Sequence, residues 1–182
     1  MATAPNSTTT ARSTLDSLRV QIENSRVDGL DPRGFVLPSS LSTIFNSTAV
    51  AAAVSELRCT AEDRLGLADA IRRGGIPTFA ILVAMSQPDL VVNFRKKRCL
   101  DRLPLDVETA RRAAGDFGAE FVRRQWEFLP YHFGLEQDVE FDQEVLPFVG
   151  DRGLLGSGGF GDIRKLEIHP WLQNFAPHDV GY

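Results

Sequence analysis

The most specific sign of a chemical function in this sequence is a set of three glycines, Gly156, Gly158 and Gly161, in the spacing G-x-G-x-x-G. Glycine has no Cβ, so the backbone N–H groups around it can come close to a phosphate oxygen, and the chain can take a positive φ. Two unrelated arrangements use this spacing. In a dinucleotide-binding turn a helix follows the glycines, whereas in the other arrangement a second strand follows them.

The residues after the last glycine favour the second arrangement. Apolar side chains at Ile163, Leu166 and Ile168 lie among charged ones, nearer a two-residue period than a helical one, and Pro170 stops the pattern. The sequence therefore predicts strand, glycine turn and strand, as in the G-x-G-x-x-G-x-V phosphate-covering loop of protein kinases. The candidate nucleotide-binding residues are Gly156, Ser157, Gly158, Gly159, Phe160 at the tip, Gly161 and Ile163. The alternative is a glycine-rich hairpin without a ligand.

Composition excludes several classes of protein. Of the 182 residues 43% are hydrophobic and 24% charged, as in ordinary globular proteins, and the net charge is −4. This charge gives no general attraction to nucleic acid or to anionic membranes, so neither is expected as a partner. No signal peptide and no apolar run of the ~18–20 residues that span a bilayer is seen, which predicts a cytoplasmic protein with two reduced thiols, Cys59 and Cys99.

Most of the chain before the glycines has helical periodicity. Residues 1–12 are small and polar, and we expect a disordered tail. Helices are predicted from Ser13-Thr14 to about Asp28-Gly29 and over 48–58, 60–75, 105–114 and 117–129, with a short extended segment at 35–37. The apolar segment 79–85 follows Pro77 and is predicted to be a buried helix. We expect one core to contain Phe79, Ile81, Leu82, Phe121, Trp126 and Leu129.

Charged runs lie on both sides of the last helix. Arg95, Lys96, Lys97 and Arg98 form a basic run that could contact nucleic acid, although a solvated face is the commoner meaning. Acids at 136, 138, 140, 142 and 144 recur at period two, which predicts an exposed edge strand or a linker. A calcium loop is rejected because Gln143 stands where glycine is needed.

These patterns predict a mainly α fold with a short β-hairpin near the C-terminus. The predicted parts are a helical domain over 13–135 and a linker with the hairpin over 136–182. A two-stranded hairpin is marginal by itself. We therefore expect Leu155, Ile163, Leu166 and Ile168 to pack against the helical domain or against a partner chain.

The order of several segments resembles the N-terminal region of filamentous-fungal serine/threonine protein-kinase-like proteins, in which helices precede a kinase-type domain. The segments that carry the resemblance, over residues 60–175, are Phe79-Ala80-Ile81-Leu82-Val83, Arg124-Gln125-Trp126-Glu127-Phe128-Leu129, Val145-Leu146-Pro147-Phe148, Leu155 to Gly161 and Lys165-Leu166-Glu167-Ile168-His169-Pro170. The resemblance implies that the hairpin is the truncated start of a kinase-like N-lobe. It also implies ATP and magnesium as the ligands of the family.

The sequence departs from the family in the groups that perform catalysis. A kinase needs a lysine on its third strand, a catalytic loop and a metal-binding D-F-G, and none of these occurs. Lys165 lies inside the second predicted strand and is not the missing lysine. The histidines, His132, His169 and His178, accompany no nucleophile motif and lack metal-ligand spacing. We therefore expect no catalytic residue, no metal site and no cofactor for this chain alone.

Three functions remain open at this point. The first is a non-catalytic regulatory or interaction region of a fungal kinase-like protein. The second is a free-standing interaction protein, such as a kinase-derived decoy or an effector recognised by a host protein. The third is an ATP-binding fragment that acts with another chain. The expected partner is accordingly a protein: its own kinase domain, another kinase-like chain or a host protein.

Overall fold

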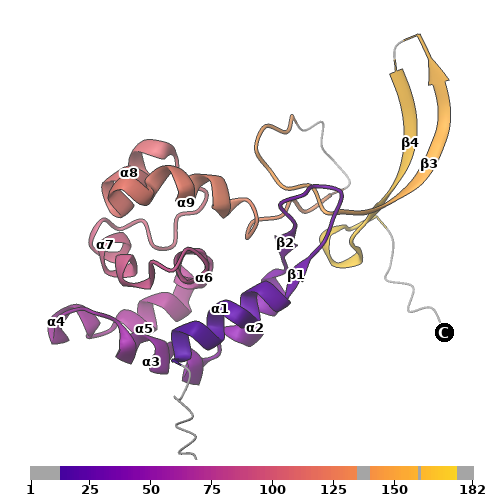
Figure 1. Cartoon of the computed structure of the whole chain (residues 1–182). Helices are drawn as coiled ribbons and strands as arrows, with labels where there is room; N and C mark the ends of the chain where they lie inside the picture. The colour runs from indigo at the N-terminus through magenta and orange to yellow at the C-terminus, as the bar shows by residue number, and fades with distance from the viewer. Residues whose placement is uncertain (1–12, 135–139, 160, 176–182) are drawn as a thin grey trace, which may run out of the picture.

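The computed structural model describes residues 13–134, 140–159 and 161–175. Helices make up most of the chain before residue 126, and a long β-hairpin projects from them (Figure 1). The helices are α1 (Thr14–Asn24), α2 (Pro38–Ile44), α3 (Ser47–Glu56), α4 (Ala61–Arg64), α5 (Leu67–Ala70), α6 (Ile76–Ala84), α7 (Val91–Lys96), α8 (Val107–Ala114) and α9 (Gly118–Gln125). The strands are β1 (Arg26–Val27), β2 (Phe35–Val36), β3 (Phe148–Gly158) and β4 (Gly161–Ile168). The mainly α prediction is confirmed, whereas the predicted tail over 1–12 lies outside the described residues.

Several helices begin where a short polar side chain satisfies a free N–H group. Ser13 Oγ accepts from Asp16 N, Thr60 Oγ1 accepts from Asp63 N, and Asp106 Oδ1 accepts from Thr109 N. These three helix starts confirm the sequence prediction. The bond from Thr109 N also holds the pKa of Asp106 below its usual value, since it favours the charged carboxylate.

The first helix is shorter than predicted. It ends at Asn24, and the next residues form β1, which pairs antiparallel with β2. The reason is tertiary: Phe35 and Val36 of β2 are fully buried, and the β1–β2 turn brings them into the interior. Gly34 takes φ +61° in this turn, a conformation that favours glycine.

The predicted helix over 60–75 is interrupted and then continues. Gly66 takes φ +66° between α4 and α5, and α5 continues into a π-helical segment, Ile71–Gly75, in which Gly74 (φ 172°, ψ −10°) breaks the helical backbone and makes a kink before α6. We call Ile71–Gly75 the π turn. The helical backbone therefore breaks at Gly74, as predicted, and α6 begins directly after Gly75. A Cβ on Gly75 would lie 2.7 Å from Leu100 Cγ, so glycine permits close packing here.

The main core surrounds α6. Phe79, Ile81, Leu82 and Phe121 are all completely buried and belong to it, as predicted. The Phe79 ring meets Phe45 edge-on, with ring centroids 5.7 Å apart. An apolar helix with four consecutive buried residues in 79–82 can only be accommodated at the centre of a helical body.

Trp126 and Leu129 do not enter this core, and the prediction for them is wrong. Helix α9 ends at Gln125, so the helical spacing that would align them with Phe121 stops there. Phe128 is buried in the main core instead. Trp126 is half-buried, and its Nε1 donates to Gln143 Oε1 at 3.2 Å.

A second, smaller cluster holds the base of the hairpin. Its buried members are Phe35, Val145 and Leu172, and we call it the root cluster. The partly buried residues packed on it are Val27, Leu37, Trp126 and Val149. Hydrogen bonds from Leu30 N to Phe148 O (2.7 Å), Phe133 N to Leu172 O (2.9 Å) and His169 N to Pro147 O (2.8 Å) fix the same region.

The root cluster joins residues from both sides of position 135. The division into domains at that position stays a prediction. Of the acidic segment, Glu136 and Asp138 lie outside the described residues. Residues 140–144 form no strand and bend at Asp142 and Gln143, so the edge-strand prediction is wrong there and the linker alternative remains.

Candidate functional site

The glycine motif lies at the end of the projecting hairpin. Strands β3 and β4 pair antiparallel up to Gly158 and Gly161, and Gly159 lies in the turn after β3. A strand, β4, and not a helix begins at the last glycine, so the strand–turn–strand prediction is confirmed and the dinucleotide-binding turn does not fit. Gly156 pairs with Ile163, and Ser157 pairs with Asp162. Phe160 lies outside the described residues.

Only one glycine of the motif has a backbone conformation that requires glycine. Gly161 takes φ +133°, which a side chain would strain. A Cβ on Gly156, Gly158 or Gly159 would meet nothing within 4 Å. Packing inside the described chain therefore does not require glycine at these three positions, and the space beside the loop is open.

The apolar side chains of the hairpin are exposed. Leu155 is 68% and Ile163 66% exposed, and Leu154 and Leu166 are exposed as well. The prediction that they pack on the helical domain is wrong for Leu155, Ile163 and Leu166, while Ile168 is half-buried near the root. Irregular pairing along β3 bends the hairpin, which projects away from the helices (Figure 1).

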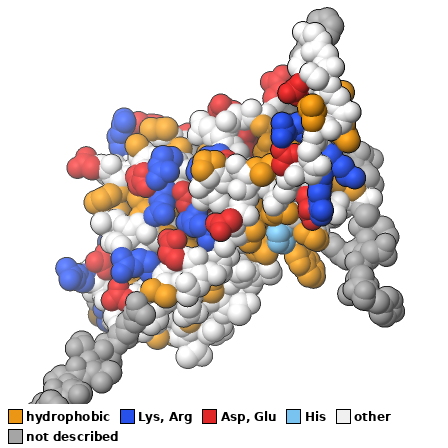
Figure 2. All heavy atoms as spheres, turned by 45° about the vertical axis from the view of Figure 1, so that its right-hand side comes forward, with side chains coloured by type: hydrophobic (Ala, Val, Ile, Leu, Met, Phe, Trp, Pro, Cys, Tyr) orange, Lys and Arg blue, Asp and Glu red, His pale blue; other side chains and the backbone are white. Residues whose placement is uncertain are grey.

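Charged side chains alternate with apolar ones along this projecting arm, as Figure 2 shows. Arg164 Nη2 lies 2.7 Å from Asp151 Oδ2, and Arg152 Nη2 lies 2.6 Å from Glu167 Oε2. Arg164 holds the pKa of Asp151 below its usual value, and Gly153 N, 2.8 Å from Asp151 Oδ1, acts in the same direction. These cross-strand pairs stabilise the register of the hairpin.

The described residues of the loop can offer a phosphate backbone N–H groups and the Ser157 hydroxyl, but no cationic side chain. The paired backbone up to Gly158 and Gly161 commits N–H groups to the ladder, which leaves fewer for a ligand. Protein metal sites are usually built from several acidic, histidine or cysteine side chains. The described residues hold no group of three such side chains that could bind a metal ion. The described loop therefore lacks the lysine and the metal ligands that bind the phosphates of a nucleotide in a kinase.

Magnesium ATP is expected to bind this chain only weakly, with a dissociation constant of ~1 mM or above, worth no more than about 4 kcal/mol. The reason is that a lysine, metal ligands and an adenine pocket normally supply the rest of the affinity. Calorimetry on the purified chain measures it. A micromolar constant that Gly158→Val abolishes would show a functioning nucleotide loop instead.

Of the described histidines, His169 has a structural setting at the hairpin root. His169 Nδ1 accepts from Trp171 N at 3.3 Å, and its ring meets Phe35 edge-on at 5.8 Å between centroids. Burial in this setting lowers the pKa of His169 and favours the neutral ring. His132 is exposed, and His178 lies outside the described residues. His169 thus acts as a structural member of the hairpin root.

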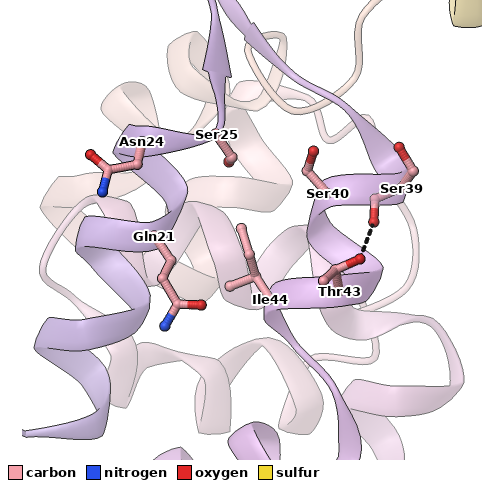
Figure 3. A pocket seen from close by; sticks show the side chains of 7 residues that line it. All are labelled: Gln21, Asn24, Ser25, Ser39, Ser40, Thr43 and Ile44. Carbon is pink, nitrogen blue, oxygen red and sulfur yellow. Dashed lines mark hydrogen bonds between the residues drawn. The ribbon is translucent and has the colours of Figure 1, made fainter.

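A pocket of about 460 Å³ lies between α1 and α2 (Figure 3). Neutral side chains line it: Gln21, Asn24, Ser25, Ser39, Ser40, Thr43 and Ile44. Amides and hydroxyls can hydrogen-bond to a neutral polar group, but none of these side chains is a strong acid, base or nucleophile at neutral pH. The pocket is therefore suited to binding a neutral polar ligand, and its lining has no side chain suited to proton transfer.

Sequence reasoning missed two surface groups. Five aromatic rings near the root contact one another, namely Tyr131, Phe133, Phe141, Phe148 and Phe175. A second group is a pocket lined by Arg73, Arg95 and Arg98. The basic run at 95–98 signalled two of these arginines, whereas Arg73 is distant in sequence and no local pattern joins it to them.

Comparisons with known proteins give no relative: no family model, no curated protein and no solved structure matches this chain. Within the described residues, no helix combines the length and the apolar character needed to cross a bilayer. The resemblance to kinase-like proteins thus stays a prediction based on the segments that carry it.

Proposed function

We propose that this chain is a non-catalytic interaction region of a fungal protein-kinase-like protein and that its projecting hairpin recognises a protein partner. The observation that carries the proposal is the exposure of Leu154, Leu155, Ile163 and Leu166 on one hairpin. Apolar side chains gathered on a projecting element typically mark an interaction surface.

The backbone of the hairpin supports the same function. β3 and β4 form a two-stranded sheet, so the outer edge of each long strand has no neighbouring strand within the described residues. Unpaired edges accept a further strand from another chain. The root cluster holds the base firmly while the distal part remains available.

The partner that fits best is a kinase-type lobe that adds its third strand to this hairpin. Such a lobe would supply the lysine that the loop lacks and cover the apolar side chains. The open space beside Gly156, Gly158 and Gly159 would let its backbone or its bound nucleotide come close. The chain by itself transfers no phosphate, because it lacks the groups that hold metal and activate an acceptor.

A photo-reactive amino acid at position 155 tests the proposal. Irradiation in a fungal extract, followed by mass spectrometry, is expected to give a product that contains a kinase-type domain. The matched control carries the same probe at Leu65, which is 77% exposed on the helical part. The control is expected to give no such product.

The result also separates the alternatives. A product of any other protein class at position 155, absent from the Leu65 control, would contradict the kinase-type partner and support a free-standing interaction protein. That second candidate is favoured by the main core, which is closed around α6 without any contribution from another chain. Equal labelling at both positions would contradict a specific hairpin surface altogether.

A further inference from the structure

A small pocket beside the π turn gathers positive charge. It has a volume of about 220 Å³, and its charged lining residues are Arg73, Arg95, Arg98 and Asp101. Three arginines and one aspartate leave a local formal charge of +2 (3 − 1 = 2) on a chain whose net charge is −4. The volume is below the ~300–1,000 Å³ of pockets for drug-sized ligands, which suits a small charged group.

The fold places the three guanidinium groups separately. Arg95 is fixed, since its Nη1 donates to the carbonyl oxygens of Asp63 (3.1 Å) and Leu65 (2.7 Å). Arg98 follows the end of α7 with φ +58°, and its N–H donates to Arg95 O at 3.0 Å. Arg73 comes from the π turn, immediately before the kink at Gly74.

Two of these arginines are available to a ligand. Within the described residues, the side chains of Arg73 and Arg98 make neither a hydrogen bond nor an ion pair, and both are exposed at the pocket. By contrast, Arg72 is paired with Asp69, and Lys96 Nζ lies 2.6 Å from Asp63 Oδ1. The guanidinium groups of Arg73 and Arg98 are thus available at the pocket, whereas these two neighbouring cations are engaged.

An apolar pocket adjoins the basic one. Its volume is about 370 Å³, and Arg73 and Gly74 line both pockets. The apolar part of its lining comes from Leu41, Ile76, Pro77, Phe128 and Leu129. An anion site and an apolar site therefore lie side by side, which matches a ligand with one charged and one apolar group.

We propose that these adjoining pockets bind a phosphorylated segment of a partner protein. The phosphate lies among Arg73, Arg95 and Arg98, and a neighbouring apolar side chain of the same segment enters the second pocket. A phosphorylated side chain carries about −1.5 to −2 charge at pH 7 and three acceptor oxygens, which matches a pocket of charge +2 better than a carboxylate does. Guanidinium groups are the usual partners of phosphate in such sites. This surface is separate from the hairpin, so the proposal does not depend on the function of the hairpin.

Titration with inorganic phosphate, followed by NMR of the full chain, tests the anion site. Saturable shifts are expected for the amides of Gly74 and Arg98, with a dissociation constant of ~1–10 mM. Arg73→Gln and Arg98→Gly are each expected to weaken binding at least tenfold. Arg98→Gly also relieves the positive φ, so it should keep or raise the thermal stability while binding falls.

Lys97→Gln is the matched control. It removes one positive charge from the adjacent exposed position, which lines neither pocket, and should leave the constant within twofold. No saturable shift in the wild-type chain, or equal weakening by Lys97→Gln and Arg73→Gln, would overturn the anion site.

A second measurement identifies the ligand. A degenerate peptide pool with a fixed phosphoserine is expected to bind at least tenfold more tightly than the same pool with serine. Leu129→Asp, at the apolar pocket, should weaken the phosphorylated pool but not inorganic phosphate. Tighter binding of AMP or of a single-stranded oligonucleotide than of the phosphorylated pool would overturn the assignment to a protein partner.

Discussion

Replacement of Glu127 by alanine is expected to lower the free energy of unfolding by ~3–5 kcal/mol, the usual effect of removing one member of a buried ion pair. The Glu127 side chain is 4% exposed, and its Oε2 lies 3.0 Å from Arg26 Nη2 and 3.6 Å from Arg124 Nε. Without the carboxylate, the largely buried guanidinium groups of Arg26 and Arg124 would lose their buried counter-charge and keep only the half-exposed carboxylates of Glu23 and Glu120.

The backbone of Glu127 makes the same connection. Its carbonyl oxygen accepts from Val36 N at 2.8 Å, so residue 127 ties β2 to the end of α9. Glu127→Gln keeps the shape and one acceptor, and a smaller loss is expected. The unfolding can be followed in urea by the fluorescence of Trp126, which is the neighbouring residue.

Glu120→Ala provides the matched control for this ion pair. Glu120 lies on α9 and pairs at 2.6 Å with Arg123 at the surface, where both side chains are about half exposed, while its distance to Arg124 Nε is a longer 3.8 Å. Exposed pairs contribute about 0–1 kcal/mol, so this variant should unfold almost as the wild type does. A loss for Glu127→Ala no greater than that for Glu120→Ala would show that the buried pair does not hold β2 to α9.

Replacement of Phe79 by alanine is expected to cost ~3–5 kcal/mol, because it empties a large, completely buried site at the centre of the main core. The loss includes the edge-on contact with Phe45, since aromatic pairs contribute about 0.5–1.5 kcal/mol beyond burial. Chemical denaturation monitored by circular dichroism measures it.

Two other aromatic substitutions calibrate this expectation. Phe117→Ala, at a position 42% exposed, should change stability by less than ~0.5 kcal/mol. Trp126→Ala should cost less than Phe79→Ala, because the Trp126 ring is half-buried on the root cluster. An effect of Phe79→Ala as small as that of Phe117→Ala would contradict a core centred on α6.

Local chemistry made parts of the fold predictable. Ser13, Thr60 and Asp106 mark helix starts because their side chains satisfy N–H groups only three residues away. The spacing after Gly161 likewise predicted a strand, since alternation is a local property. The burial of Phe79, Ile81 and Leu82 followed from an apolar run too long to expose.

The sequence predictions fail where the local structure depends on contacts with residues that are distant in sequence. Helix α9 stops at Gln125 because Glu127 is held by Arg26 and Val36, which lie about a hundred positions earlier. No window of sequence around Trp126 contains that information. The basic pocket is missed for the same reason, since the π turn brings Arg73 to Arg98 only in the folded chain.

The anchoring of the hairpin at its root alone has a consequence for local opening. Amides near Phe148 and Ile168 are tied to the helices through the root cluster, so their hydrogen exchange should require unfolding of a large cooperative unit. Amides near Ser157 and Asp162 can open with only the end of the ladder. Protection is therefore expected to fall steadily from root to tip, and a partner seated on the tip would be recorded as a rise in protection confined to that end.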